Sequence, residues 1–437
     1  MKFLLAVLLL VASSPTHSQT NRTRNEPELF PVAVNQKLGY IDVRGKIVIP
    51  LKFSIRDPNG YFNEEQFFKE GLAVVSDDKH SGFIDKTGSF VIQGQYYPNG
   101  HFADGLARVS DSTGKVGFID RTGRYVIAPR FERAEDFAGN LALVELQGKW
   151  GYIDRTGRFA ILNRFDDAQS FQDGLARVNI ASVRRGYIDQ TGKFLTIPNE
   201  TEDFREPTDG LMAVKIGNKW GFINLLGQLV IAPQFEPDLD EYREDRYEGI
   251  FRSGLALVKL NGKYGYIDHS GKLAIPPKFD KAKPFQDDRA RVAMNGKWGL
   301  INQRGEFVAA PRFQELEMFY EDRAVASLDG KLFGFIDRSG KLSIAPQFNE
   351  AQRFSEGLAC VKKAVQVDGK TTWLWGYIDR SGQFVIKPQF TYEGIFERGL
   401  ARQMIFECVC HALNKPGRRN EWGYLDRTGK FVWKSTD

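Results

Sequence analysis

The stretch GKWGYIDRTGRF, residues 148–159, constrains this chain more than any other feature, because variants of it return from one end to the other. Eleven copies align on the pattern Gly-aromatic-Ile-Asp, centred on Gly39, Gly82, Gly117, Gly151, Gly186, Gly221, Gly265, Gly299, Gly334, Gly376 and Gly423. The basic spacing is about 35 residues, and four units are longer because they carry insertions. A fixed period in this range is typical of a stacked or circular repeat array.

Each unit has the parts of a β-meander. GLARV at 174–178 alternates as a strand does, and a hairpin turn with glycine follows, as in QGK at 147–149. WGYID then forms a second strand, RTG a second turn, and a segment such as RYVI at 124–127 a third strand. The pattern therefore predicts an all-β chain of three-stranded antiparallel meanders.

The aspartate of the motif lies three residues before a glycine, as in Asp154 and Gly157. A side-chain oxygen there accepts the backbone N–H two residues on, and glycine takes the left-handed position that closes the turn. A row of aspartates also raises the question of calcium. Asn224 and Asn302 hold the same place in two units, and an amide caps a turn without bringing charge for a cation, so turn capping is the prediction.

The third strand leads into IAPRF at 127–131 and then into a linker of the form Phe-x-x-Ala-x-x-Phe, such as Phe131, Ala134 and Phe137. Proline removes a hydrogen-bond donor and ends the strand ladder. The spacing of three in the linker predicts a tight helical turn whose apolar edge lies across the gap between units.

Alternation along WGYID places Trp150 and Tyr152 on one face of the strand and Gly151 and Ile153 on the other. A narrow sheet that is apolar on both faces cannot be stable alone, so each unit is expected to pack between copies of itself. Gly151 should then let an adjacent sheet approach closely. The tryptophan before the glycine recurs at Trp150, Trp220, Trp298, Trp375 and Trp422, but Ser81 and Arg185 interrupt the row, which favours packing over a ligand track.

The segments KWGYIDRTGRF (149–159), KWGFINLLGQL (219–229), KWGLINQRGEF (297–307) and LWGYIDRSGQF (374–384) resemble the WG-repeat, or KWG-repeat, proteins of bacteria. The resemblance covers the chain from about residue 30 to its end. It implies a β-rich repeat array of bacterial origin and brings no general catalytic residues with it.

We expect residues 30–437 to form an open or superhelical array of these repeats. Eleven blades of three strands would be unusual for a propeller. The alternative is a pair of propeller-like subdomains divided near the insertion at 236–250.

The first residues have the parts of a secretory signal: Lys2, an apolar run at 3–12, then small and polar residues. The run is too short to span a bilayer. We therefore expect a signal peptide at 1–18, a short linker at 19–29, and a mature protein without a transmembrane segment in the periplasm or outside the cell. An uncleaved anchor is the alternative.

The 60 basic and 55 acidic residues are interspersed, which argues against nucleic-acid binding. No H-E-x-x-H, G-x-S-x-G or G-x-G-x-x-G motif occurs, so neither enzymatic activity nor a cofactor is predicted. Cys408, Cys410 and His411 could supply metal ligands, but strand alternation points His411 away from the two sulfurs and a fourth ligand is lacking. No metal site is predicted.

These observations favour a non-enzymatic scaffold that binds a protein or peptide, with glycan or cell-wall binding through exposed aromatic residues as the alternative. Recognition is expected on the inserted loops that the repeats hold. The candidate residues are Tyr242 and Tyr247 in the 236–250 insertion and Lys415, Arg418 and Arg419 at the tip of the C-terminal hairpin. That hairpin could instead cap the end of the array.

Overall fold

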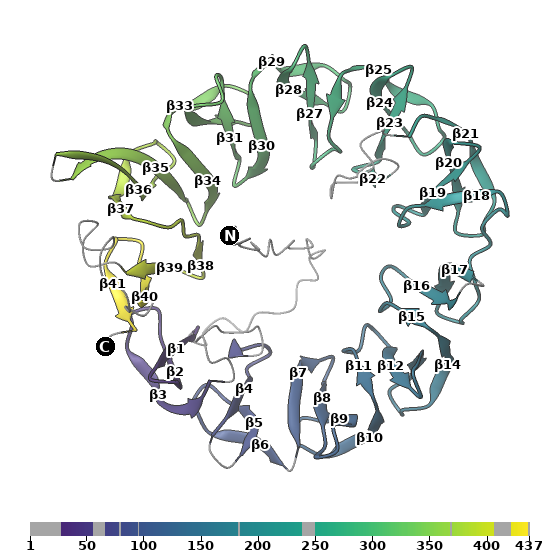
Figure 1. Cartoon of the computed structure of the whole chain (residues 1–437), viewed down its shortest axis with the longest axis vertical. Coiled ribbons are helices and arrows are strands. Elements are labelled where there is room, and N and C mark those ends of the chain that lie inside the picture. Colours follow the sequence, from purple (N-terminus) through teal and green to yellow (C-terminus); the bar gives the residue numbers. More distant parts are fainter. Residues whose placement is uncertain are drawn as a thin grey trace, which may run out of the picture.

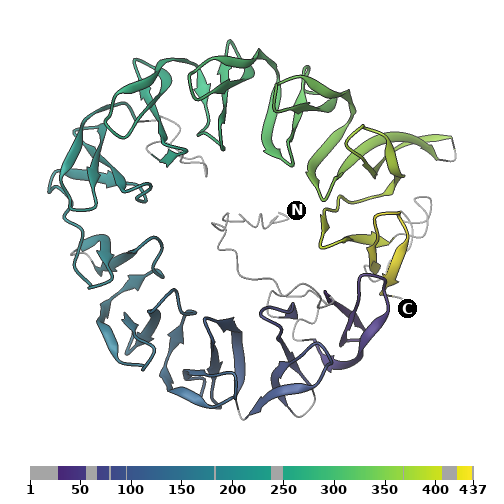
Figure 2. The same ribbon diagram turned by 180° about the vertical axis from the view of Figure 1, so that it is seen from behind.

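The strands of the protein form ten antiparallel sheets arranged around a ring, as the computed structural model shows (Figures 1 and 2). The structure describes residues 28–55, 66–77, 80–94, 96–181, 184–237, 250–367, 369–405 and 421–435, and these contain no α-helix. In a typical sheet the first strand lies nearest the centre of the ring and the last lies on the outer rim (Figure 1).

The strands follow one another in the order of the sequence. The first sheet contains β1 (Phe30–Val34), β2 (Lys37–Ile41), β3 (Ile47–Ser54), β4 (Ala73–Ser76), β5 (Ser81–Ile84) and β6 (Phe90–Gly94). The next three contain β7 (Tyr97–Ala103), β8 (Leu106–Ser110), β9 (Val116–Ile119) and β10 (Tyr125–Phe131); β11 (Arg133–Ala134), β12 (Ala142–Leu146), β13 (Lys149–Ile153) and β14 (Phe159–Phe165); and β15 (Asp167–Ala168), β16 (Leu175–Ile180) and β17 (Arg184–Asp189). The following three contain β18 (Thr201–Phe204), β19 (Leu211–Ile216), β20 (Lys219–Asn224) and β21 (Leu229–Phe235); β22 (Phe251–Arg252), β23 (Leu255–Leu260), β24 (Lys263–Ile267) and β25 (Leu273–Phe279); and β26 (Lys281–Ala282), β27 (Arg289–Met294), β28 (Lys297–Asn302) and β29 (Phe307–Phe313). The last three contain β30 (Glu315–Tyr320), β31 (Arg323–Ser327), β32 (Phe333–Asp337) and β33 (Leu342–Phe348); β34 (Glu350–Ser355), β35 (Leu358–Val367), β36 (Lys370–Ile378) and β37 (Phe384–Phe390); and β38 (Phe396–Glu397), β39 (Leu400–Ile405), β40 (Glu421–Leu425) and β41 (Phe431–Lys434).

Most sheets have four strands, so the prediction of three-stranded units is wrong. The linker supplies the extra strand: in β11, Arg133 pairs with Glu145 and Ala134 with Val144 of β12. The predicted helical turn is therefore wrong as well. The backbone groups of the linker form hydrogen bonds with the neighbouring strand: the N–H of Glu135, for example, donates to the Leu143 carbonyl at 2.8 Å. In a helical turn these groups would bond within the linker itself.

Each sheet buries both faces against its neighbours, as the alternation predicts. Ile153 lies in a cluster with Phe118 and Phe131 of the preceding sheet, whereas Tyr152 lies in a second cluster with Val178 and Ile188 of the following one. The core is thus a series of separate apolar layers between sheets. The repeats are mutually dependent because no layer is complete within one unit.

Gly151 is needed for a reason other than the predicted one. A Cβ atom there would lie 2.6 Å from the Asn163 nitrogen and 2.8 Å from the Ile161 carbonyl oxygen. Both belong to β14 of the same sheet, where the register shifts between Trp150 and Tyr152. The bulged outer strand, and not an adjacent sheet, closes over the glycine.

The outer strands continue through the proline that was expected to end the ladder. Pro129 lies inside β10, within the register shift between Ile127 and Phe131. Proline and a bulge both blunt an exposed sheet edge, because they leave fewer free donors for another chain to pair with. The motif thus protects the rim of the ring.

The array closes, which corrects both predicted arrangements, the open or superhelical array and the pair of subdomains (Figure 1). Phe30 of β1 packs against Tyr424 of β40 with ring centroids 5.5 Å apart, and the Tyr424 hydroxyl donates to the Pro31 carbonyl at 3.2 Å. On either side of the 236–250 insertion, Phe235 and Phe251 share one core cluster. The angle between successive sheets decides closure, and that angle depends on the fit of side chains in each layer.

One sheet departs from the rest. The sheet β15–β17 has three strands, and the place of its outer strand is taken by a segment with a single β-bridge, from Ile188 to Phe194. Here Gly186 is less crowded than Gly151, since a Cβ atom would lie 3.6 Å from its nearest neighbours, Phe194 and Ile197.

Candidate functional site at the closure of the ring

The five residues predicted for partner binding, Tyr242, Tyr247, Lys415, Arg418 and Arg419, lie outside the residues that the structure describes. Cys408, Cys410 and His411, considered as metal ligands, lie outside them too. The candidate site is therefore built from the described part of the chain.

A cavity of about 600 Å³ lies where the first sheet meets the last, and we call it the seam pocket. This volume is within the usual range of roughly 300–1,000 Å³ for ligand sites. Its lining consists of Phe30, Phe67, Phe68, Lys69, His101, Ile395, Glu397, Arg398, Leu400, Arg402 and Tyr424.

The seam pocket follows from the incomplete first repeat. The first strand, β1, occupies the position that β12 occupies in its own sheet. Among the described residues, no strand pairs with β1 on the side that faces the centre of the ring. Elsewhere that place is filled, for example by β11. Phe30 and Tyr424, which line the pocket, are 4% and 6% exposed.

The basic side chains of the seam pocket are held in place by neighbours. Arg398 pairs with Glu28, with Nε 3.1 Å from Oε1, and Arg402 lies over the indole ring of Trp422 at 4.2 Å. Burial raises the pKa of the Tyr424 hydroxyl, which therefore stays protonated at neutral pH. The lining has three cations, Lys69, Arg398 and Arg402, and one carboxylate, Glu397, around the aromatic floor, with the imidazole of His101 beside them. This lining suits a chain segment that carries apolar and acidic groups.

Three of the five repeat tryptophans are buried, as the packing prediction expects, whereas Trp150 and Trp298 are partly buried. Trp220, Trp375 and Trp422 are buried, and cations lie over their rings: Arg205 over Trp220 at 4.3 Å and Lys362 over Trp375 at 5.5 Å. A ring covered on one face by a cation and on the other by the core has no free face for a sugar. These three positions contribute to stability.

The aspartate turns also have the predicted geometry. One carboxylate oxygen of Asp154 accepts the N–H groups of Thr156 and Arg158 at 2.8 and 3.0 Å, and Gly157 has φ +84°. The hydrogen bond from the Thr156 hydroxyl lowers the pKa of Asp154 below its usual value. Asn224 accepts from Leu226 and Gln228 in the same way. Across the described ranges, no three His, Cys, Asp or Glu side chains gather as a metal site would require.

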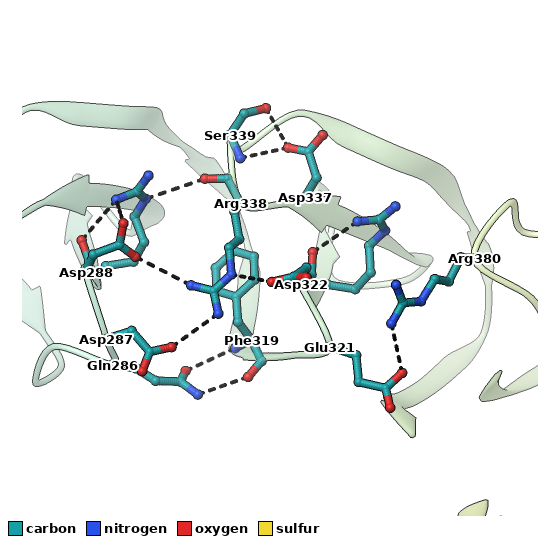
Figure 3. Close-up of polar contacts among 12 residues, drawn as sticks. Gln286, Asp287, Asp288, Phe319, Glu321, Asp322, Asp337, Arg338, Ser339 and Arg380 are labelled. Carbon is teal, nitrogen blue, oxygen red and sulfur yellow. Dashed lines mark hydrogen bonds and ion pairs between the residues drawn. The ribbon is translucent and has the colours of Figure 1, made fainter. Parts of the chain in front are cut away.

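In several of these turns the arginine after the aspartate joins its sheet to the one before it, a contact that was not predicted from the sequence. Arg155 donates to the Asp104 carbonyl at 2.8 Å. Arg338 pairs with Asp287 at 3.2 Å and with Asp322 at 2.6 Å, while Arg380 pairs with Glu321 at 3.2 Å (Figure 3). We call this row of contacts the arginine ladder.

A signal for the arginine ladder exists in the sequence. The partners of Arg121, Arg155 and Arg338 all lie 51 residues earlier, at Glu70, Asp104 and Asp287. At this separation, the turn between the last two strands of one sheet contacts the turn between the first two strands of the preceding sheet. A search for opposite charges 51 residues apart would have found these three contacts, but not that of Arg380 with Glu321, which are 59 residues apart.

Cys360 is buried. Burial raises the pKa of its thiol to about 12, so it stays protonated and is a poor nucleophile.

The geometry defines the class: an all-β repeat protein whose sheets form a propeller-like ring. The model of the WG containing repeat matches residues 82–111, 117–150, 150–181, 186–220, 220–236, 246–264, 264–298, 298–331, 333–370 and 375–402. These segments make up more than half of the chain, which therefore belongs to the WG-repeat family.

No curated protein matches the chain. Among solved structures, BamB from Moraxella catarrhalis is similar, with 12% identity and a TM-score of 0.25 over 70% of this chain and 94% of that one. PorZ, a bacterial surface component of the type-IX secretion system of Porphyromonas gingivalis, has 9% identity and a TM-score of 0.23 over 87% of this chain and 57% of that one. Likenesses this distant transfer no function. Within the described residues, no helix has the length and hydropathy to cross a membrane.

Proposed function

We propose that this chain is a non-enzymatic scaffold that binds a protein or peptide partner, and that the seam pocket takes an extended segment with apolar and acidic side chains. The observation that supports this most is the lining of the seam pocket, where Lys69, His101, Arg398 and Arg402 surround an aromatic floor. Opposite charge on a partner would steer association, and burial of the floor would contribute affinity.

The lining also supports the non-enzymatic part of the proposal. Arg398 and Arg402 are engaged by Glu28 and Trp422, which favours holding a ligand over transferring a group.

A phage-displayed peptide library tests the proposal directly. The protein is expected to enrich peptides that combine aromatic or aliphatic residues with Asp or Glu, and Lys69→Glu should lower their affinity at least tenfold. Lys281→Glu, which makes the same charge change on the inner strand β26, is the matched control and should leave the affinity unchanged.

Glycan binding is the competing outcome. Cosedimentation with insoluble cell-wall polysaccharide, together with failure to enrich any peptide, would contradict the proposal. Equal loss of peptide binding in the Lys69 and Lys281 variants would show that the peptides do not bind in the seam pocket.

We also propose that the protein is exported, on the evidence of the charged and apolar segment at 2–12. N-terminal sequencing of the protein from fractionated bacteria should find a chain beginning near Gln19. Recovery of intact Met1 in the membrane fraction would contradict export.

A further inference from the structure

The arginine ladder has one acidic residue without a cation opposite it. At the left-handed turn position, Glu70, Asp104, Asp209, Asp287, Glu321 and Glu356 each contact the ladder residue of the following sheet. Asp173 has the same backbone conformation, with φ +49°, but the residue that corresponds to the arginine is Leu225. No ion pair of Asp173 is found among the described residues.

A cavity of about 100 Å³ occupies the place of the missing arginine, between β16 and β17 on one side and the turns of β18–β21 on the other. Asp173, Asp209, Glu206 and Leu225 line it. A water-sized group needs roughly 10–15 Å³ of such volume, so a planar guanidinium fits. The cavity also contains Arg177, but its carboxylates outnumber that one cation.

Tyr187 provides a second, independent sign of a ligand. Its side chain lines the cavity and is only 6% exposed. The equivalent hydroxyls of Tyr152 and Tyr266 each donate to a carbonyl of the next sheet, at 2.7 Å. Within the described residues the Tyr187 hydroxyl has no such hydrogen bond. The hydroxyl oxygen therefore has an acceptor site at the cavity that a donor of a guest group could occupy.

The filled positions show how a guest would be held. The Arg155 guanidinium donates to the carbonyl oxygens of Asp104 and Gly139. The residues at the equivalent turn positions around the cavity are Asp173 and Asp209, and both line it. Beside them Leu225 is 39% exposed and Leu226 76% exposed. This apolar edge suits the aliphatic stem of an arginine side chain.

We propose that this cavity binds an arginine side chain of a partner protein, which completes the arginine ladder from outside. The inference deepens the proposed scaffold function and rests on it, since it names one chemical group by which the partner docks. A guanidinium matches the site better than an ammonium, because its planar fork of donors can reach carboxylates, a carbonyl and a hydroxyl at once.

The test uses N-acetyl-arginine amide and its neutral analogue N-acetyl-citrulline amide, titrated against the whole protein by NMR and calorimetry. We expect saturable binding of the arginine compound with a dissociation constant of about 1 mM, and at least tenfold weaker binding of citrulline. Asp173→Asn should weaken binding of the arginine compound about tenfold. Asp104→Asn, at a position where an arginine of the chain is already bound, should leave the binding unchanged.

Leu225→Arg should abolish binding because the chain then fills its own cavity, whereas Leu226→Arg should leave it intact. Absence of saturable binding, equal binding of citrulline, or unchanged binding by Leu225→Arg would each overturn the inference. Peptides selected through the seam pocket would still bind in that case, so failure of the cavity and failure of the scaffold are distinguishable.

Discussion

Two junctions between sheets differ in how much of the repeat pattern they keep. At the junction of β26–β29 with β30–β33, Arg338 bridges Asp287, Asp288 and Asp322 (Figure 3). At the junction of β15–β17 with β18–β21, Leu225 takes the arginine's place. The first junction uses these charged groups in its own contacts, whereas at the second no ion pair of Asp173 and no hydrogen bond of the Tyr187 hydroxyl is found among the described residues. The difference indicates that a regular repeat uses its polar groups internally, and that an irregular one can offer them to a partner.

The two glycines Gly151 and Gly186 give the largest expected contrast between the two kinds of unit. Gly151→Ala places a Cβ atom against the backbone of β14 and should lower the free energy of unfolding by roughly 3 kcal/mol, since backbone cannot move aside as a flexible side chain does. Gly186→Ala meets only ordinary contacts and should change stability by less than about 0.5 kcal/mol. Urea unfolding of both variants measures the contrast. Equal losses would show that the bulge over Gly151 is not the cause.

This contrast also shows how far sequence could go. The strands, the turn caps at Asp154, the packing of Trp220 and the two apolar faces were all predicted, because each depends on neighbours in the chain or on alternation. The fourth strand, closure of the ring and the contact over Gly151 were not. They depend on where a linker folds back and on the angle between layers, which no local pattern contains.

The seam pocket and the cavity opposite Leu225 escaped prediction for a related reason. Both arise where the repeat pattern is broken: in the described part of the chain no inner strand pairs with β1, and residue 225 is leucine where several other units have arginine. A deviation from the repeat, such as Leu225, can be seen in the sequence. Its consequence can be judged only when the residue that normally contacts this position is known. That residue lies more than a repeat away.

The arginine ladder should show a smaller effect than the glycines. Arg338→Ala removes contacts to three carboxylates, but the side chain is 39% exposed, so solvent screens them. We expect a loss of about 1 kcal/mol at low salt and less in 1 M NaCl. Arg304→Ala is the control: it removes an arginine from the equivalent turn, but one position after the ladder residue, and should have no effect. A salt-independent loss would indicate that packing on Phe319 and not charge is responsible.

Leu225→Arg should sharpen the comparison by repairing the irregular junction. A guanidinium at residue 225 would face Asp173 and should raise the free energy of unfolding by about 0.5 kcal/mol, as exposed pairs do. Leu226→Arg adds the same charge outside the cavity and serves as the control. A loss of stability in Leu225→Arg alone would mean that the cavity is too small for the group.

The smallest effect concerns the turns that both kinds of junction share. Hydrogen bonds, first of all from the Thr156 hydroxyl, lower the pKa of Asp154, so the folded protein binds a proton there less readily than the unfolded chain. The stabilisation is therefore fully present above the unfolded pKa of about 3.9 and is lost as the pH falls through the lower folded value. Asp154→Asn keeps an oxygen that accepts the same N–H groups, as Asn224 does in its own turn, but the amide does not titrate. The variant should be slightly less stable than the parent at pH 7, because a charged acceptor makes the stronger hydrogen bonds, and the two should converge near pH 3. Thermal unfolding between pH 7 and pH 3 measures this, and melting curves that stay parallel over the whole range would rule out the carboxylate as a source of acid sensitivity.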